Sequence, residues 1–171
     1  MKRYIYKNLL EWKNDTGRKP LILKGARQVG KTYILKEFGK NEYQDLAYFN
    51  FEENPNLKEL FKGILTHYNI LEKLSIDFGR KILPEKTLIV FDEVQESPET
   101  LTSLKYFYEL SYEYNVIASG SLLGIKLGQQ RAFPVGKVNL LHLYPLSFGE
   151  YLDGIGKSMI NELINNKVDF N

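Results

Sequence analysis

A glycine-containing loop is the first place where this sequence could do chemistry. Residues 25–32, GARQVGKT, match the pattern G-x-x-x-x-G-K-[ST]. Glycines let the backbone curl so that successive N–H groups point at a phosphate, and a helix beginning near Lys31 directs its positive end at the same anion. Lys31 is expected to reach the β- and γ-phosphates of a nucleotide, and the Thr32 hydroxyl to bind Mg²⁺. The predicted phosphate-binding residues are Gly25, Ala26, Arg27, Gln28, Val29, Gly30, Lys31 and Thr32.

Two carboxylates, Asp92 and Glu93, directly follow the apolar segment 87–91 (TLIVF). Because ligands of an open parallel sheet bind beyond the carboxyl ends of its strands, Asp92 is expected near the phosphate loop. There it would bind Mg²⁺ through water, together with Thr32. Glu93 is then the expected base that polarises an attacking water. An acidic pair after a strand is more often an ordinary loop start, so the phosphate loop at the same sheet edge carries this interpretation.

The elements that must position these residues alternate between short apolar runs and amphipathic helices. This pattern is typical of an α/β protein with a mostly parallel sheet. Strands are predicted at 21–23, 46–51, 87–91, 116–118 and 138–144, and helices at 4–12, 31–38, 55–63, 69–78, from 98 and from 147. Gly39 and Gly79 are expected to end helices, and Ser147 with Glu150 has the spacing of a capping box.

The order of these strands along the chain predicts the topology. One strand, 46–51, lies between the strand that precedes the phosphate loop and the strand that ends in Asp92. Together with the Glu after the Asp, this order marks the phosphate-loop proteins that carry an additional strand and a catalytic glutamate. It disfavours GTPases and simple nucleotide kinases. A kinase would also need paired lid arginines, and residues 120–136 contain one arginine, Arg131. We therefore expect a three-layer α/β P-loop NTPase fold with a mostly parallel five-stranded sheet of order 5-1-4-3-2.

Further motifs resemble one family closely. GARQVGKT, LIVFDEVQ, LKYFYE, IASGSLLG and FPVGKV followed by LYPLSF are similar to the AAA+-related ATPases of bacteria and archaea, in which an ATPase core precedes a C-terminal domain of unknown function. The resemblance covers about residues 3–152. It implies an ATPase core over residues 1–146, led in by the helix at 4–12. Residues 147–171 are then a helical appendage, the start of a segment missing from this chain.

The resemblance implies that ATP and Mg²⁺ bind and that an activated water attacks the γ-phosphate. Glu93 would act as base and Lys31 would stabilise charge. The alternative is a nucleotide-gated binding module with little or no hydrolysis. A protein partner or self-association stays open in either case.

The resemblance also suggests roles for polar residues at other strand ends. Ser121, or otherwise Ser119, would contact the attacking water or the γ-phosphate as sensor 1, with a simple Ser-Gly turn as the equal alternative. Asn50 would hold Glu93 in an unproductive pose, although bonding to its own backbone is the preferred interpretation.

A cation on the γ-phosphate would accelerate hydrolysis, and two residues are candidates for it. Arg131 and Lys137 lie in or after the glycine-rich loop, and for both a solvated loop charge is the preferred interpretation. Relatives often carry Arg at the position of Lys137, and Lys lacks the bidentate fork of Arg. Arg27 is expected to face solvent or an adjoining domain.

Composition excludes several other classes of protein. The 171 residues contain no cysteine, which rules out disulfides, thiol catalysis and cysteine-based metal sites. The formal charge of +2 does not indicate nucleic acid as a partner. Neither His67 nor His142 has partners at metal-ligand spacing. No apolar run approaches the roughly 18 residues of a membrane span, so a cytoplasmic location is expected.

Overall fold

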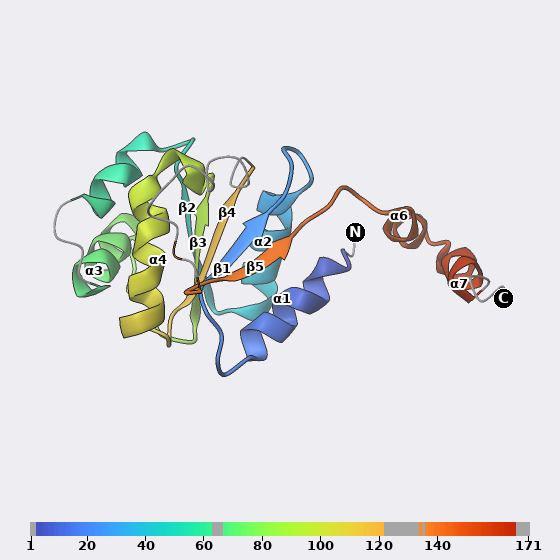
Figure 1. The fold of residues 1–171 in the computed structure, drawn as a ribbon, viewed down its shortest axis with the longest axis horizontal. Helices are drawn as coiled ribbons and strands as arrows, with labels where there is room; N and C mark the ends of the chain where they lie inside the picture. Colours follow the sequence, from blue (N-terminus) through green and yellow to red (C-terminus); the bar gives the residue numbers. More distant parts are fainter. Residues whose placement is uncertain (1–2, 63–66, 122–133, 135, 167–171) are drawn as a thin grey trace.

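A five-stranded parallel sheet forms the centre of the molecule (Figure 1). The computed structural model describes residues 3–62, 67–121, 134 and 136–166. The strands are β1 (Leu21–Lys24), β2 (Asp45–Asn50), β3 (Thr87–Asp92), β4 (Asn115–Gly120) and β5 (Asn139–His142). Their order is β2-β3-β4-β1-β5, and every neighbouring pair is parallel. The predicted fold class and the strand order 5-1-4-3-2, read from the opposite edge, are confirmed.

Helices cover both faces of this sheet (Figure 1). On one face lie α1 (Ile5–Asn14) and α2 (Lys31–Glu42). On the other lie α3 (His67–Phe78), α4 (Pro98–Leu110) and the 3₁₀ helix η1 (Pro55–Phe61). A second short 3₁₀ helix, η2 (Val94–Glu96), follows β3. All six residues of β3 are buried, which explains the apolar run before Asp92, the last residue of the strand.

Local signals in the sequence account for most of the helix ends. Pro98 occupies the first turn of α4, and Asn54 caps η1 by accepting the backbone N–H of Asn56. Gly79 follows α3 with φ at +74°, a conformation that glycine adopts at little cost. These starts and this stop agree with the predictions. The predicted helix end at residue 63 is two residues late, because η1 ends at Phe61 and the backbone of Lys62 is extended.

The predicted helix stop at Gly39 is wrong. Gly39 is buried inside α2, which continues to Glu42. A Cβ at this position would lie 2.6 Å from Cδ1 of Leu46. The glycine is therefore there for close packing of α2 on β2, and not for a left-handed cap.

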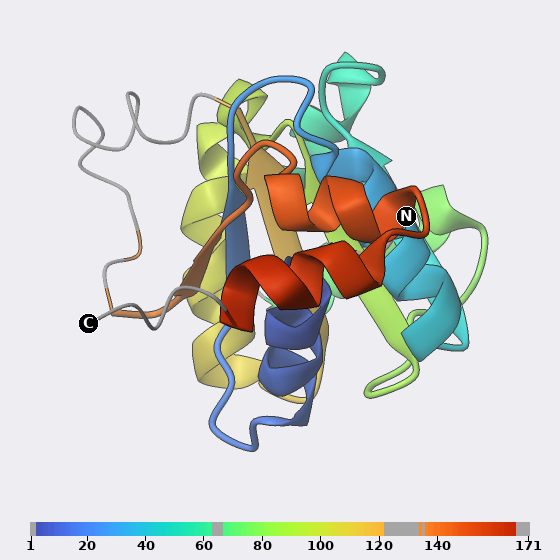
Figure 2. The same cartoon turned by 90° about the vertical axis from the view of Figure 1, so that its right-hand side faces the viewer.

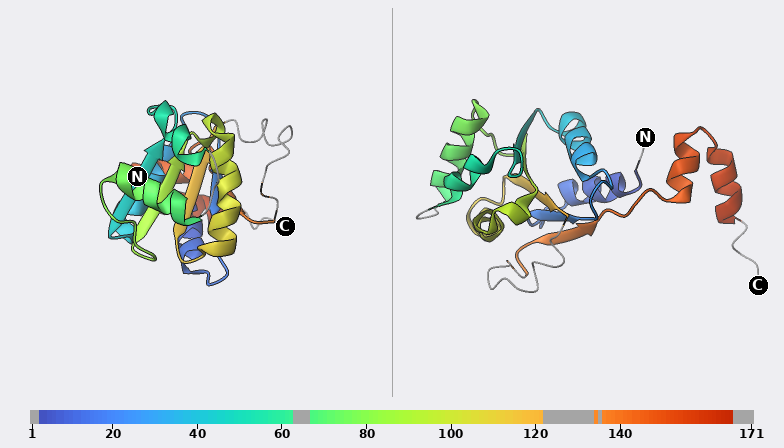
Figure 3. Two further views of the ribbon diagram at one scale, coloured as in Figure 1. Left: turned by 90° about the vertical axis from the view of Figure 1, so that its left-hand side faces the viewer. Right: turned by 90° about the horizontal axis from the view of Figure 1, so that it is seen from above.

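Two further helices, α6 (Phe148–Gly154) and α7 (Ser158–Asn166), follow the sheet. They pack on each other and stand to one side of the α/β body (Figures 1 and 3). Figure 2 looks from this side, with α6 and α7 in front of the body. The predicted capping box of α6 is present, since Ser147 and Glu150 each accept the other's backbone N–H. Within the described part of the chain, no helix is long and apolar enough to cross a membrane.

Candidate functional site

The loop that joins β1 to α2 has the backbone of an anion cradle. Gln28 and Gly30 both have positive φ, at 63° and 93°, and α2 begins at the next residue, Lys31. The first N–H groups of a helix have no acceptor within the helix, and left-handed residues before it turn further N–H groups inward. Gly25 packs so tightly on the chain after β5 that a Cβ would lie 2.4 Å from the carbonyl oxygen of Leu143. The loop is thus held at the carboxyl edge of the sheet.

Lys31 places a buried cation inside this loop. The residue is 5% exposed, and its ammonium donates to the carbonyl oxygens of Gly25, at 3.0 Å, and Ala26, at 2.8 Å. Burial lowers the pKa of Lys31, and this effect outweighs the opposite effects of Glu93 and Asp92. An anion in the loop would replace the two carbonyls as the partner of this ammonium and offset the cost of its burial.

Four donors from different parts of the chain converge on Asp92. Its Oδ2 accepts the hydroxyls of Thr32 and Tyr48, each at 2.6 Å. Its Oδ1 accepts the hydroxyl of Ser119 and, at 3.0 Å, the backbone N–H of Glu93. Asp92 is fully buried, so these bonds fix the carboxylate in one orientation. The end of β3 is thereby tied to α2, β2 and β4.

The pair Thr32 and Asp92 fits a magnesium ion. Hydroxyl and carboxylate oxygens are hard ligands of the kind that Mg²⁺ prefers, and Mg²⁺ in proteins is commonly held by one or two such groups, with phosphates and water completing the shell. Within the described residues, no three His, Asp or Glu side chains gather as a metal cluster. The donors present therefore suit a metal that arrives with a phosphate ligand.

Glu93 lies beside Asp92 but is engaged by a neighbour. Its backbone is left-handed, with φ at 52°, and its carboxylate accepts the side-chain amide of Gln95 at 2.5 Å. The side-chain oxygen of Asn50 accepts the backbone N–H groups of Glu52 and Glu53, at 2.9 and 3.1 Å. The preferred interpretation of Asn50, a bond to its own backbone, is confirmed. The residue that contacts the Glu93 carboxylate is Gln95, which the sequence did not single out.

The two serines after β4 differ in their partners. The Ser119 hydroxyl is buried and donates to Asp92. The Ser121 hydroxyl is also buried, and it has no hydrogen-bond partner among the described residues. Ser119 is therefore part of the support of Asp92, whereas Ser121 retains a hydroxyl that can bond a ligand.

The predicted cations fall in three different places. Arg27 is exposed in the phosphate loop. Lys137 pairs with Glu109 at 3.2 Å and its ammonium lies over the ring of Tyr108, which agrees with a surface charge. Arg131 lies outside the described residues.

Besides Gln95, two more residues near the site were missed by the sequence reasoning. Tyr48 bonds Asp92, and its pKa is raised by burial and by this bond. Arg3 donates to the carbonyl oxygen of Val29 in the phosphate loop at 2.9 Å. Neither residue belongs to a recognisable motif; only the strand register, which aligns Asn50 with Asp92, indicates that the end of β2 meets the site.

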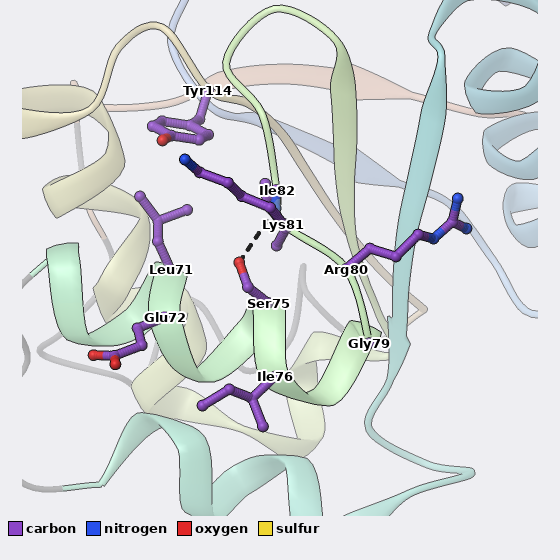
Figure 4. Close-up of a pocket in the computed structure, with 9 residues that line it drawn as sticks. All are labelled: Leu71, Glu72, Ser75, Ile76, Gly79, Arg80, Lys81, Ile82 and Tyr114. Atoms are coloured by element: carbon purple, nitrogen blue, oxygen red, sulfur yellow. Dashed lines mark hydrogen bonds between the residues drawn. The ribbon is translucent and has the colours of Figure 1, made fainter.

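Two hollows in the surface bear differently on this site. One of about 510 Å³ adjoins the phosphate loop and is lined by residues of the loop, Arg3, Tyr33, Pro145 and Leu146. Another, of about 640 Å³, lies between the end of α3, the segment after it and Tyr114 (Figure 4). Tyr114 and the segment after α3 precede β4 and β3. This second hollow is therefore at the opposite edge of the sheet from Asp92.

The fold and the loop define a protein of the P-loop nucleotide-binding class. A family model described as AAA domain matches residues 17–152, which span β1 to α6. The chain belongs to this AAA domain family. The resemblance to AAA+-related ATPases is thus confirmed.

Solved structures of other proteins share this fold. The Walker-type ATPase PABY2304 of Pyrococcus abyssi superimposes with a TM-score of 0.57 at 15% identity, over 99% of this chain and 60% of its own. The Pif1 helicase from Bacteroides, solved with ADP-AlF₃ and single-stranded DNA, gives 0.51 at 15% identity, over 84% of this chain and 42% of its own. This chain therefore spans about three fifths of the first protein and two fifths of the second. A search of curated proteins finds no match.

Proposed function

We propose that this chain binds ATP together with Mg²⁺ and hydrolyses its γ-phosphate bond. The observation that carries the proposal is the convergence of Lys31, Thr32 and Asp92 at the carboxyl edge of the sheet, with Thr32 Oγ1 2.6 Å from Asp92 Oδ2. Membership of the AAA domain family supports ATP as the nucleotide.

Each group of the site has a role in this proposal. The backbone of residues 25–30 and the ammonium of Lys31 hold the β- and γ-phosphates. Thr32 and Asp92 would hold Mg²⁺, which would neutralise charge on the phosphate oxygens. Glu93 accepts the proton of the attacking water, and Ser121 orients that water or the phosphate.

The hollow beside the phosphate loop is the proposed place of the nucleoside. Its volume of about 510 Å³ is in the range of small-molecule sites, roughly 300–1,000 Å³. Tyr33, Pro145 and Leu146 offer the apolar lining that a base requires. The exposed side chain of Arg27 adds a positive charge at its rim.

Calorimetric titration with ATP and Mg²⁺ tests binding. We expect Lys31→Ala to weaken ATP binding by about 100-fold or more, because it removes the only side-chain cation that the motif directs at the phosphates. Lys40→Ala is the matched control, since Lys40 is exposed on the same helix, and it should bind like the parent chain. Absence of binding by the parent chain would overturn the proposal.

A second candidate function is a nucleotide-gated binding module with little hydrolysis. The bond from Gln95 to Glu93 favours it, because a base engaged in this way is not free to activate water. Phosphate release by the parent chain and by Glu93→Gln distinguishes the two. Release that falls about 100-fold or more in Glu93→Gln supports hydrolysis with Glu93 as base. ATP binding by both proteins without phosphate release from either supports the module.

A further inference from the structure

One arginine joins the phosphate loop to the C-terminal helices. Arg3 is 9% exposed at its side chain and donates to three acceptors. They are the carbonyl oxygen of Val29 at 2.9 Å, the carbonyl oxygen of Tyr144 at 2.7 Å, and the carboxylate of Glu150 at 3.0 Å. Val29 belongs to the phosphate loop, Tyr144 follows β5, and Glu150 closes the capping box of α6.

The bond to Val29 acts directly on the phosphate-binding backbone. The carbonyl of Val29 and the N–H of Gly30 belong to one peptide unit, which is planar and trans, so they point in opposite directions. Holding the carbonyl with a guanidinium therefore fixes the direction of the Gly30 N–H. This N–H is one of the donors that the loop offers to a phosphate.

The helix pair α6–α7 is seated on the body through the same corner. Besides Arg3, the backbone N–H of Tyr4 donates to Glu150 at 2.7 Å, and its hydroxyl donates to Asp153 at 2.8 Å. Asn161 of α7 donates to the Tyr4 hydroxyl, also at 2.8 Å. Polar bonds with defined directions thus set the position of α6 and α7, and such bonds respond to small rotations of their partners.

We propose that Arg3 is a positioning residue of the nucleotide site, and that it couples occupancy of the phosphate loop to the seating of α6–α7. The inference rests on the proposed function, because it needs ATP to bind at this loop. The Arg3 guanidinium contacts both the phosphate loop and α6. A ligand that holds the Val29 carbonyl in place therefore also favours the bond from Arg3 to Glu150. By linkage, seating of α6 must favour nucleotide binding to the same extent as nucleotide favours seating.

The first experiment measures ATP affinity by calorimetry in the presence of Mg²⁺. Arg3→Ala and Arg3→Lys should both bind about tenfold more weakly than the parent chain, because a lysine ammonium lacks the fork that reaches three separate acceptors. Lys7→Ala is the control: Lys7 lies in α1, its side chain is 84% exposed and it pairs only with the exposed Glu11 in the described structure. It should bind ATP like the parent chain.

The second experiment measures hydrogen exchange of the backbone amides in residues 148–166, with and without ATP and Mg²⁺. Exchange in the parent chain and in Lys7→Ala should slow when ATP binds. In Arg3→Lys, at ATP concentrations that saturate the variant, this slowing should be lost. If Arg3 only stabilised the fold, its replacement would lower the thermal midpoint of unfolding, and both the ATP affinity and the slowing of exchange by ATP would be unchanged.

The outcomes separate the two proposals. No ATP binding by the parent chain overturns the proposed function and this inference with it. The inference alone is overturned if the parent chain binds ATP, Arg3→Lys binds ATP within twofold of the parent chain, and ATP has no effect on exchange in α6–α7 of the parent chain. Should Arg3→Ala fail to fold, Arg3→Lys and Glu150→Gln decide, because both keep the size and polarity of the side chain they replace.

Discussion

Asp92 is the residue on which the site depends, because both of its oxygens are occupied by donors from other elements. Tyr48 and Thr32 bond one oxygen, while Ser119 and the Glu93 backbone bond the other. Groups that orient a metal ligand commonly change metal affinity when they are removed, even though they do not touch the metal. The support of Asp92 is therefore open to test through its phenolic donor.

Tyr48→Phe should raise the Mg²⁺ concentration that ATP binding requires by about tenfold. The ring remains to pack beneath Lys36, but Asp92 loses a donor that fixes its orientation. The measurement is ATP binding as a function of Mg²⁺ concentration. Tyr112→Phe, at a site 72% exposed, is the control. An unchanged Mg²⁺ dependence in Tyr48→Phe would show that the hydroxyl contributes nothing to the site.

Ser121→Ala should reduce phosphate release by about tenfold or more, while ATP affinity and stability stay close to those of the parent chain. Stability is spared because the buried hydroxyl has no partner among the described residues, so its removal breaks no bond there. Phosphate release, calorimetry and urea unfolding measure the three quantities. Loss of stability without loss of turnover would assign the hydroxyl to the fold.

Among single residues, the sequence predicted those site residues that belong to a motif at the end of a strand, and few others. GARQVGKT and the acidic strand end identified Lys31, Thr32 and Asp92 as neighbours because their places in a parallel sheet are set by topology. Tyr48 and Gln95 could not be found, since a tyrosine within a strand and a glutamine after one have many possible partners. Only the packed structure decides which partner each meets.

At the scale of the elements, β1 and the segment after β5 are closely packed beside the site. Gly25 directly follows β1, where the chain after β5 passes, and the Leu143 N–H donates to the carbonyl oxygen of Lys24 at 2.7 Å. A side chain at residue 25 would push against backbone atoms that cannot move without breaking this bond.

Gly25→Ala should destabilise the protein by about 2 kcal/mol and weaken ATP binding as the loop shifts. The added Cβ would meet the Leu143 carbonyl oxygen at 2.4 Å. The free energy of unfolding in urea is the measurement. Gly17→Ala serves as control, because its Cβ would meet the nearest atom at an ordinary 3.5 Å, and it should stay within about 0.5 kcal/mol of the parent chain. Equal stability of the two variants would contradict this account.

Element types were predictable where capping residues and apolar period agree. Ser147 with Glu150 predicted the start of α6, and Gly79 predicted the end of α3. The prediction at Gly39 was wrong because the sequence alone does not distinguish a glycine required for close packing from one that ends a helix. The difference lies in Leu46, seven residues later, which occupies the space beside it.

Across the whole molecule, the attachment of α6 depends on pH through Glu150. Burial raises the pKa of Glu150, but the N–H groups of Ser147 and Tyr4 and the guanidinium of Arg3 together lower it below the ordinary 4.5. A lowered pKa stabilises the folded state fully above pH 4.5, and this contribution is lost as the pH falls through the lower folded value.

Glu150→Gln should therefore destabilise the protein at pH 7 and differ less from the parent chain at pH 3. Urea unfolding at the two pH values measures the difference. Glu162→Gln, exposed on α7, is the control and should show no such pH dependence. A constant difference between Glu150→Gln and the parent chain at both pH values would mean that the Glu150 charge does not contribute.

The topology of the whole molecule followed from the order of motifs, because parallel strands with intervening helices leave few ways to connect them. The division into a core at 1–146 and an appendage at 147–171 stays a prediction. Arg3 shows why it was hard to draw: a residue of the first few positions is bonded to the first turn of α6, about 150 positions later. Sequence distance hides such a contact.

The register of β1 has a consequence for synthesis of the protein on the ribosome. Leu21 is among the first strand residues to emerge, yet it pairs with Ile117 of β4 and Asn139 of β5. At about 5–20 residues per second, the ribosome needs several seconds to deliver these partners. Until residue 139 has emerged, β1 lacks both of its neighbours in the sheet, so the phosphate loop that follows β1 cannot yet be held at the carboxyl edge of a complete sheet.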